Sequence, residues 1–583
     1  MNTQPGTNKT YDVLVLGSGL GGSISAAILA RKGWRVLLIE AGTHPRFAIG
    51  EATTPDTSCR LKIMSKKYGI PEFDHLTTFH KLRDHISPAC GIKKSFSFLY
   101  HREGETQNPL ESHQFPTLAP PLGPDCHFFR QDTDAYMLAI ALRYGAEVRQ
   151  RTQIAQTDCG GAGVVLTSDK GEVFKGRFLV DASGFRSPIA QKFDLREAPT
   201  SLKTKSRAIF THMVGVHHYD ETCPPLKTFG FKYPFCQGTL HHVFDGGWMW
   251  VIPFDNHPDT TNPLCSVGIL LDLDKFPVSG KDPETEFNEI IARFPSVAKQ
   301  FADAKAVREW VGTGRIQYSS KTILGPRFCQ IAHAAGFVDP LYSSGLNLTV
   351  SVIDDLMPEL DAALVEDQFQ EQRFASVDRN FQNHLRHYDT MIANAFHSFK
   401  DFELWDAWFR IWVAGNFVAT CLNTNLFINY MAKKDISIFE RCKQAPFSGV
   451  LGSHFEPGKE VFDRADELMA RHLKGELTAK EAGDATRQLF ANIKFMPSYF
   501  RWHDRRKRYP STFTVPSGTR MFLWFALKAP KPIRQAMMAW KVTGIYAYVW
   551  RCLWAHRKRN NRRKFGYFRD TFLAKSRDWQ ASD

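Results

Sequence analysis

The 583-residue chain lacks the features that mark several common protein classes. Its 11 cysteines include no CxxC pair, so they indicate neither a disulfide framework nor a zinc site. The N-terminus has no charged segment followed by an apolar one, which a secretory signal would require. The nearest approach to a membrane span, residues 537–554, is interrupted by Lys541 and Arg551. We therefore expect a cytoplasmic protein with reduced thiols, no metal centre and no transmembrane helix.

Excess positive charge is missing from most of the chain, although the formal net charge is +14 at pH 7. Residues 501–583 hold 20 Lys and Arg but only four Asp and Glu, together with 16 Phe, Trp and Tyr. The rest of the chain holds 54 basic and 56 acidic residues and is close to neutral. This distribution argues against a nucleic-acid partner and makes the basic, aromatic C-terminal region a separate question.

A glycine-rich turn near the N-terminus is the first feature with a chemical meaning. Residues 11–16 and 35–40 are short apolar runs typical of buried parallel strands, and residues 23–32 have helical spacing. The turn between the first strand and the helix follows the GxGxxG pattern, with its three glycines at Gly17, Gly19 and Gly22. The order of these elements predicts a βαβ unit.

The three glycines and one acid suit a dinucleotide. The first glycine permits a tight turn, the second lets the backbone approach a pyrophosphate, and the third lets the helix pack closely on the strand. Glu40 ends the second strand, where a carboxylate accepts hydrogen bonds from an adenosine ribose. These positions predict a nucleotide-binding domain.

Three later segments resemble parts of the glutathione-reductase-type FAD fold of flavoprotein hydroxylases. Residues 179–184 (LVDASG) and 334–340 (AAGFVDP) are apolar runs that reach an Asp. The second run resembles the segment whose Asp, here Asp339, contacts the ribityl chain of FAD. Arg130 resembles an Arg that precedes a helix in the same superfamily. The resemblance implies an α/β fold that binds FAD rather than NAD.

A second nucleotide-binding turn is absent from the sequence. Residues 160–163 (GGAG) are glycine-rich, but they lie in a predicted hairpin rather than in a βαβ unit. We therefore expect that the chain has no NAD(P)H domain of its own and that a separate flavin reductase supplies the reduced flavin.

One hexapeptide points to a particular chemistry. Trp248, Trp250, Ile252 and Pro253 form the pattern WxWxIP. Alternate aromatic residues on a strand share one face, so the pattern alone also fits a core strand that ends at Pro. In an FAD protein of this order, the intact hexapeptide resembles the signature of flavin-dependent halogenases. The resemblance implies a strand between flavin and substrate that disfavours ordinary hydroxylation.

Two further segments resemble the same family. Residues 50–55 (GEATTP) resemble part of the flavin cradle of this family. The resemblance implies that Gly50 and Glu51 bind the cofactor. Residues 339–345 (DPLYSSG) resemble a loop whose backbone N–H groups form a small halide site. The resemblance implies cofactor contacts at Asp339 and Pro340 and halide contacts at Ser344 and Gly345.

The family also has an essential lysine on a strand that leads toward the substrate. The matching region, residues 90–98 (CGIKKSFSF), offers Lys93 and Lys94. Side chains of adjacent strand residues point to opposite faces, so only one of them can face the site. Counting back from Phe98 favours Lys93, although a lysine pair is also common on solvated surfaces.

The resemblance implies a two-component halogenase. FADH2, O2 and chloride or bromide would produce hypohalous acid, which the lysine would direct to one carbon of the substrate. Tryptophan halogenases carry a Glu at the position of Tyr342, so this residue favours a phenol-like or pyrrole-like substrate pocket in natural-product biosynthesis. The alternative is an FAD-dependent monooxygenase, or a geranylgeranyl-reductase-like flavoprotein that acts on a lipophilic substrate.

The domain organisation follows from these segments. We expect an FAD-binding domain in two parts, at 8–205 and 306–365, with a substrate-facing β-sheet domain at 206–305. Aromatic strand-like runs, including 227–235, predict that sheet. Residues 366–583 are expected to form a helical region. Its basic, aromatic end at 501–583 suits peripheral contact with a membrane, an acidic carrier protein that bears the substrate, or a solvated face over a core.

Overall fold

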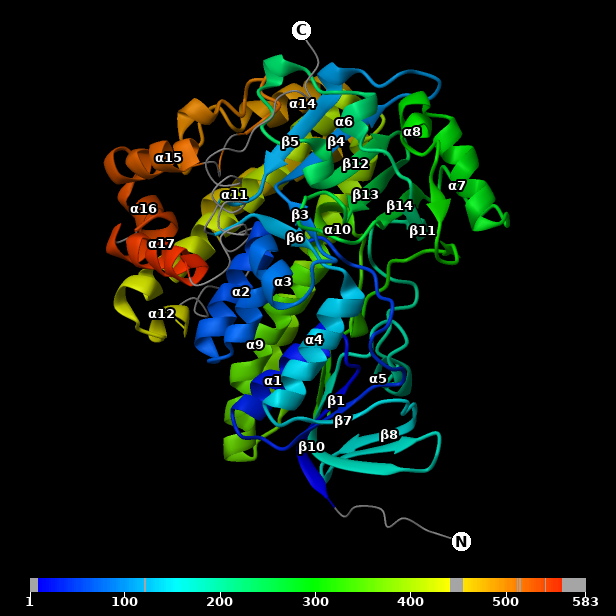
Figure 1. Ribbon diagram of the computed structural model, residues 1–583, viewed down its shortest axis with the longest axis vertical. Helices are drawn as coiled ribbons and strands as arrows, with labels where there is room; N and C mark the ends of the chain where they lie inside the picture. Colours follow the sequence, from blue (N-terminus) through cyan, green and yellow to red (C-terminus); the bar gives the residue numbers. More distant parts are fainter. Residues whose placement is uncertain are drawn as a thin grey trace.

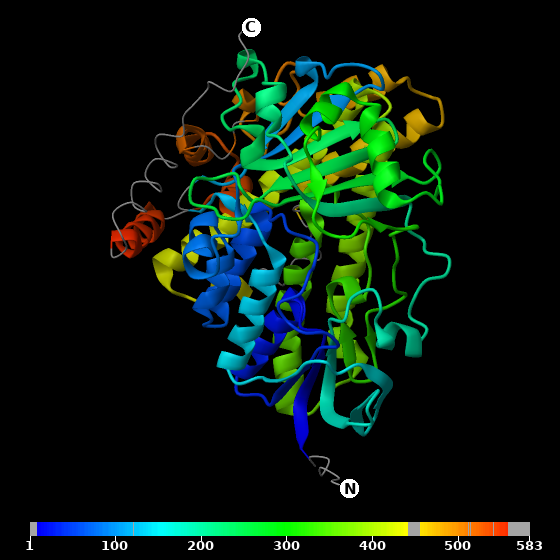
Figure 2. The ribbon, with the colours of Figure 1, turned by 45° about the vertical axis from the view of Figure 1, so that its right-hand side comes forward.

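The computed structural model describes residues 9–119, 122–440, 455–510, 512, 515–539 and 542–557. Two large sheets lie one above the other, with helices packed along them (Figure 1). Figure 2 shows the green strands of the upper sheet above the blue and cyan strands of the lower one. The α/β fold predicted from the sequence is confirmed.

The lower sheet contains the predicted nucleotide-binding unit. Its main path runs in the order β17-β18-β10-β1-β2-β7, and β9 continues from β10 to β8. The bounds are β1 Thr10–Leu16, β2 Val36–Ile39, β7 Glu147–Arg149, β8 Ile154–Gly160, β9 Gly163–Ser168, β10 Val173–Asp181, β17 Leu324–Gly325 and β18 Phe328–Gln330. β1 pairs in parallel with β2 and β10, so the carboxyl ends of these strands meet at one edge.

Both faces of the lower sheet are covered, which explains why its strands read as continuous apolar runs. Val13 and Val15 pack on the side of α1 (Leu20–Arg31), while Leu14 and Leu16 pack with β8 and β9. Helices α4 (Arg130–Arg143) and α9 (Ser344–Glu366) both contact α1. The short α5 (Pro188–Lys192) contacts β8.

The upper sheet is mixed, as predicted, and runs in the order β15-β11-β14-β13-β12-β4-β5, with β16 also on β11. The bounds are β4 Ser95–His101, β5 Ser112–Pro116, β11 Ser206–Val214, β12 Gly238–Phe244, β13 Gly247–Pro253, β14 Cys265–Asp272, β15 Lys305–Ala306 and β16 Val311–Gly312. β4 and β5 come from the chain before residue 206, so this sheet draws on two distant segments. Residues 227–235 form no strand, because Gly230 is left-handed and Pro234 has no N–H group.

A two-stranded ribbon and three helical segments adjoin the sheets, and the helix α3 contacts both strands of the ribbon. β3 (Gly91–Lys93) pairs antiparallel with β6 (Asp125–His127). α2 (Pro55–Lys67) contacts both α9 and the 3-10 helix η1 (Pro71–Leu76), which in turn contacts α3 (Phe79–His85). α7 (Pro283–Ala292) and α8 (Pro295–Gln300) cover the other side of the upper sheet.

The helical region after residue 366 joins the same hydrophobic core as the two sheets. Its helices are α10 Glu371–Ser398, α11 Phe402–Lys433, α12 Ser437–Glu440, α13 Glu456–Leu473, α14 Ala479–Gln488, α15 Val515–Leu527, α16 Lys531–Met537 and α17 Val542–Arg557. The ring of Phe98 on β4 contacts Trp405 and Phe409 on α11. α11 is long and apolar enough to cross a membrane, but 83% of its most apolar window is buried inside the protein. We interpret it as a core helix.

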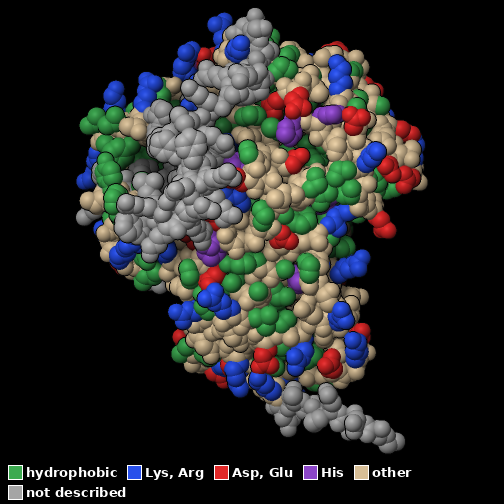
Figure 3. Space-filling view, viewed as in Figure 1, with side chains coloured by type: hydrophobic (Ala, Val, Ile, Leu, Met, Phe, Trp, Pro, Cys, Tyr) green, Lys and Arg blue, Asp and Glu red, His purple; other side chains and the backbone are tan. Residues whose placement is uncertain are grey.

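The basic, aromatic segment is partly core as well. Trp502 and Tyr509 are buried, and Arg410 of α11 donates to the carbonyl oxygens of Trp502 and Lys507. Farther along, α15 and α17 leave four large apolar side chains exposed: Leu523, Leu527, Tyr546 and Trp550. Figure 3 shows hydrophobic and basic side chains along the upper left edge, where Figure 1 places α15. Residues 558–583 of the predicted basic segment lie outside the described residues.

Candidate active site

The glycine turn at the carboxyl edge of the lower sheet has the geometry that the sequence predicts. Gly17 has φ +93°, and a Cβ on Gly22 would lie only 1.9 Å from the Gly17 carbonyl oxygen. Gly19 is the N-cap of α1, and no side chain caps this helix or adds an acid to its first turn. Its N-terminal N–H groups therefore remain open to an anionic group.

Glu40 lies directly beside this turn. Its Oε2 accepts hydrogen bonds from the backbone N–H and hydroxyl of Ser18, both at 2.8 Å, and its Oε1 accepts from the Gly42 N–H at 2.9 Å. Arg46 Nη2 lies 3.5 Å from Oε2. Burial raises the pKa of Glu40, but these hydrogen bonds and the Arg46 charge outweigh it, so the pKa lies below its usual value. Glu40 is therefore an ionised acceptor at the strand end.

Arg130 holds the loop that follows. Its guanidinium donates to the carbonyl oxygens of Ile49 and Gly50 at 2.8 and 3.1 Å and pairs with both carboxylate oxygens of Asp134. Gly50 itself has φ +96°, a conformation that favours glycine. The predicted cofactor residues Gly50 and Arg130 are thus brought together, with Arg130 acting on the loop backbone.

Two predicted cofactor carboxylates are instead engaged with the upper sheet. Glu51 accepts from Ser266 Oγ at 2.8 Å and lies 2.7 Å from His212 Nε2. Asp339 accepts from Ser206 Oγ at 2.5 Å and from Trp248 Nε1 at 3.2 Å. Burial raises the pKa of Asp339 to about 7. Both side chains therefore tie the cofactor loops to β11, β13 and β14.

The signature hexapeptide forms β13. Trp248 and Trp250 lie on the same face of this strand, and Trp250 Nε1 donates to Ser266 Oγ at 3.2 Å. Ile252 belongs to the same buried cluster. A Cβ on Gly91 would lie 2.5 Å from the Pro253 carbonyl oxygen, so the end of β13 abuts β3, which bears Lys93. The signature strand thus lies between the Asp339 loop and the lysine-bearing ribbon.

The segment after Pro340 leads into the N-terminus of helix α9. Tyr342 and Ser343 both have positive φ, at +69° and +57°, and α9 begins at Ser344. Two consecutive left-handed residues other than glycine are strained, and such strain is concentrated at functional sites. The N–H groups of Ser344 and Gly345 lie in the first turn of α9, where the helix dipole favours an anion.

His333 is a site residue that the sequence reasoning missed. Its Nε2 is buried and has no hydrogen-bond partner in the described part of the chain. A Cβ on Gly345 would lie 3.0 Å from this nitrogen, so His333 faces the start of α9. Burial lowers the pKa of His333 to about 4, which keeps the ring neutral. The sequence signal that could have identified His333 is its position just after β18, because ligands bind at the carboxyl edge of such a sheet.

The two lysines have different environments. Lys93 is fully buried, and its Nζ donates to the Thr53 carbonyl oxygen at 2.7 Å, lies 3.5 Å from Ser343 Oγ and sits 3.5 Å above the Phe96 ring. Lys94 Nζ donates to Gln237 Oε1 at 2.9 Å. Lys93 therefore reaches Ser343 in the loop before α9, whereas Lys94 contacts Gln237. Burial lowers its pKa to about 7, against an opposing effect of Asp125.

Aromatic rings from β4, β5, α11 and the segment before α9 gather next to Lys93. The Phe96 ring lies 5.1 Å from that of Trp412, and the Trp412 ring stacks on Tyr342. Phe98 and Phe115 also contact this group. Tyr342 was predicted as a pocket residue, but Trp412 lies on α11, where the sequence offered no motif. All five rings are buried, so they form a packed aromatic cluster beside the Lys93 amine.

Comparison with known proteins agrees with this geometry. The tryptophan halogenase family matches residues 102–410, and a Rossmann-like NAD(P)-binding domain matches residues 15–68. Monodechloroaminopyrrolnitrin halogenase PrnC of Pseudomonas fluorescens is 38% identical over 531 residues, which cover 90% of this chain and 93% of that protein. The chain belongs to the flavin-dependent halogenases. Tetracycline 7-halogenase of Kitasatospora aureofaciens is 42% identical over 484 residues, or 82% of this chain and 86% of that protein.

Solved halogenase structures share the fold. The crystal structure of halogenase PltM in complex with phloroglucinol and FAD has a TM-score of 0.82 and 32% identity, and it covers 86% of this chain and 99% of that one. This halogenase therefore uses FAD, and its residues fit that cofactor. The uncapped N-terminus of α1 suits the pyrophosphate, and the unpartnered His333 Nε2 offers a further polar contact.

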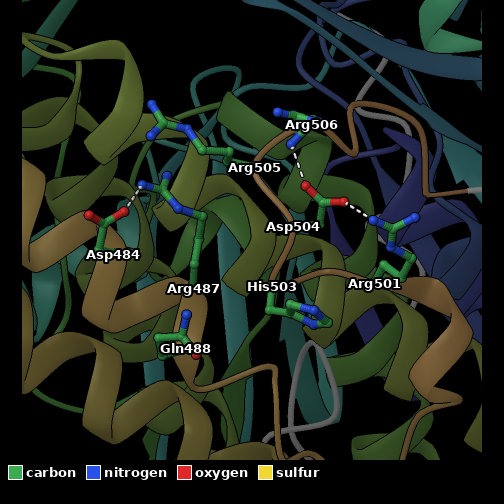
Figure 4. Close-up of a pocket in the computed structure, with 8 residues that line it drawn as sticks. All are labelled: Asp484, Arg487, Gln488, Arg501, His503, Asp504, Arg505 and Arg506. Atoms are coloured by element: carbon green, nitrogen blue, oxygen red, sulfur yellow. Dashed lines mark hydrogen bonds and ion pairs between the residues drawn. The ribbon is translucent and has the colours of Figure 1, made fainter.

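A separate pocket of about 400 Å³ opens in the C-terminal region, between α14 and residues 501–506 (Figure 4). It contains several arginines, but Arg487 pairs with Asp484 and Arg501 pairs with Asp504. The lining shares no residue with the halogenase site. We interpret it as a polar surface hollow.

Proposed function

We propose that this halogenase chlorinates or brominates an electron-rich, phenol-like or pyrrole-like small molecule and that Lys93 directs the halogen. When bound in its reduced form, FAD supplies the electrons with which O2 converts halide into hypohalous acid. A separate flavin reductase delivers the reduced cofactor, because the chain has no second GxGxxG turn in a βαβ unit.

The observation that carries this proposal is the position of the Lys93 amine. It lies beside Ser343, one residue before α9, and above the Phe96 ring that faces Trp412. A halide at the N–H groups of Ser344 and Gly345 would therefore lie on the same side of the site as the amine. A freely diffusing oxidant would have no regiochemistry, whereas a fixed lysine supplies position.

Tyr342 and the names of the relatives support the substrate class. Tyr342 presents an aromatic ring, where tryptophan halogenases carry a Glu. Two relatives are named as halogenases of monodechloroaminopyrrolnitrin and of tetracycline, and PltM was crystallised with phloroglucinol, a phenol. A phenol or pyrrole ring is activated by its own heteroatom, so it needs no carboxylate beside it.

We favour a free small molecule as the substrate. We also favour the cytoplasm as the place where the enzyme acts. More distant relatives act on pyrrole groups carried by a peptidyl-carrier protein, so a tethered substrate is the competing form. Several aromatic residues of the basic segment are buried and cannot meet such a partner or a membrane. Membrane contact through 501–583 stays a prediction, which vesicle pelleting across ionic strength tests.

The decisive experiment supplies a flavin reductase, NADH, FAD and either chloride or bromide to a panel of phenols and pyrroles, with mass spectrometry of the products. Wild-type protein should add one halogen, and Lys93→Ala should add none. Lys94→Ala is the matched control and should retain activity. An oxygenated product would favour a monooxygenase, and loss of activity in Lys94→Ala alone would contradict the assignment of Lys93.

A further inference from the structure

Lys93 has a direct cross-strand partner. In the β3–β6 ribbon it pairs with Asp125, while Ile92 pairs with Cys126 and Gly91 with His127. Residues directly opposite on two antiparallel strands project from the same face, with Cβ atoms about 4.5–5.5 Å apart. The ribbon therefore places a carboxylate on the same face as Lys93, whose amine reaches Ser343 just before α9.

Asp125 has unused hydrogen-bonding capacity. It is fully buried, and its Oδ1 accepts from Ser58 Oγ on α2 at 2.7 Å. Its Oδ2 is buried and has no hydrogen-bond partner within the residues described. A buried carboxylate without full pairing is costly unless it serves a charge nearby.

The other titratable groups described around Lys93 and Asp125 are positively charged or neutral, so they do not replace the negative charge of Asp125. From α2, the buried Lys62 contributes a second positive charge, and its Nζ donates to the Thr77 carbonyl oxygen at 3.3 Å. Burial lowers the pKa of His127 on β6 and of His241 on β12 to about 3, so both rings are neutral. Burial also raises the pKa values of Cys59 and Cys126, so both remain thiols.

We propose that Asp125 is a positioning residue that sets the protonation state of Lys93 through their cross-strand pairing. The effect of Asp125 on catalysis rests on the function proposed for Lys93. The effect of Asp125 on the protonation of Lys93 does not depend on that function. Burial raises the pKa of Asp125 to about 6 and lowers that of Lys93 to about 7, and each charge opposes the effect of burial on the other. The two groups thus titrate as a pair near neutral pH.

The test measures the Lys93 titration directly. The holoenzyme with oxidised FAD carries lysine labelled with carbon-13 at Cε, and the Lys93 resonance is assigned by its loss in Lys93→Arg. Asp125→Asn removes the charge that favours the ammonium, so the pKa of Lys93 should fall by about one to three units. Asp125→Glu should restore most of the wild-type value. An unchanged titration in Asp125→Asn would overturn the proposal.

Matched variants separate this effect from simple destabilisation. Asp389→Asn removes another buried carboxylate, which accepts from the backbone N–H groups of residues 203 and 204, and it should leave the Lys93 titration unchanged. If Asp125→Asn does not fold, Ser58→Ala replaces it. Loss of that hydrogen bond raises the pKa of Asp125, so the Lys93 titration should move downward by a smaller amount, and no movement would again overturn the proposal.

Halogenation assays distinguish the two proposals. The limb of the pH–rate profile that reports Lys93 should move to lower pH in Asp125→Asn, in parallel with the resonance. If Lys93→Ala still halogenates while Asp125→Asn lowers the pKa of Lys93, the function proposed for Lys93 fails and its pairing with Asp125 stands. If Lys93→Ala is inactive but Asp125→Asn leaves both titrations unchanged, only the pairing fails.

Discussion

Tyr342 stacks on Trp412 with ring centroids 4.6 Å apart and ring planes at 15°. The two residues are 70 positions apart, and one precedes α9 while the other lies in the N-terminal half of α11. Their contact joins the strained loop beside the predicted halide site to the helical C-terminal region. The helical region therefore helps to build the site rather than only adjoining it.

Replacement of Trp412 should weaken substrate binding. Trp412→Leu removes a ring from the aromatic group beside Lys93, and an aromatic pair is worth about 0.5–1.5 kcal/mol. We expect the KM for a phenolic substrate to rise about three- to tenfold. The control is Trp408→Leu, an equally buried tryptophan on the same helix that contacts Phe462 instead. Equal KM values in the two variants would contradict the assignment.

Removal of the Tyr342 hydroxyl should not destabilise the protein. This hydroxyl is buried with no hydrogen-bond partner among the described residues, and such a group costs about 1–3 kcal/mol. Tyr342→Phe should raise the free energy of unfolding by about 1 kcal/mol. Tyr100→Phe is the matched control, because the Tyr100 hydroxyl donates to the Phe399 carbonyl oxygen at 2.7 Å, and it should lower stability. Denaturant titrations compare the two, and a similar loss in both would refute the prediction.

Asp406 should be essential for stability, and its effect should depend on pH. This buried carboxylate meets Arg410, Arg487 and Arg508 at 2.9, 3.1 and 2.7 Å and thereby joins α11, α14 and residues 501–510. Burial raises the pKa of Asp406, but the arginine charges outweigh it and hold the pKa well below its usual range. Asp406→Asn removes the carboxylate that pairs with the buried Arg410 and Arg508, while Arg487 keeps Asp484, and it should cost about 3–5 kcal/mol.

The sign of the pH dependence follows from that lowered pKa. The stabilisation by Asp406 is complete above the unfolded pKa of about 4 and is lost as the pH falls toward the folded value. The thermal stability of wild type should therefore fall below about pH 4. The difference in stability between wild type and Asp406→Asn should shrink there. Asp463→Asn, which removes an exposed partner of Lys459, should change little. A difference that stays constant with pH would argue against this account.

Loss of the His333 imidazole should weaken FAD binding. The buried Nε2 faces the start of α9 without a protein partner, so it is available to the cofactor. We expect His333→Ala to raise the Kd for oxidised FAD about tenfold, a cost of roughly 1.4 kcal/mol for one buried hydrogen bond. Fluorescence quenching of FAD measures it without turnover. The exposed His503→Ala should bind FAD as wild type does, and an unchanged Kd in His333→Ala would exclude this contact.

The nucleotide-binding unit could be predicted because its determinants are local. Gly17, Gly22 and Glu40 lie within 24 residues, and the strand, turn and helix that hold them each have a clear periodicity. The WxWxIP strand was recognisable for the same reason. The strand predicted at 227–235 was wrong because its apolar residues are interrupted by a left-handed glycine and a proline, which override apolar content.

The sequence by itself determined the fold class, the FAD cofactor and the halogenase family, since short motifs in a fixed order carry that information. Only the tertiary structure decided which lysine reaches the α9 loop, because Lys93 and Lys94 are adjacent and differ only in the face they occupy. It also brought Trp412, His333 and Asp125 next to Tyr342, Gly345 and Lys93, which the sequence had predicted as site residues. Their partners lie far away in sequence, and such contacts depend on packing between elements that leaves no local pattern.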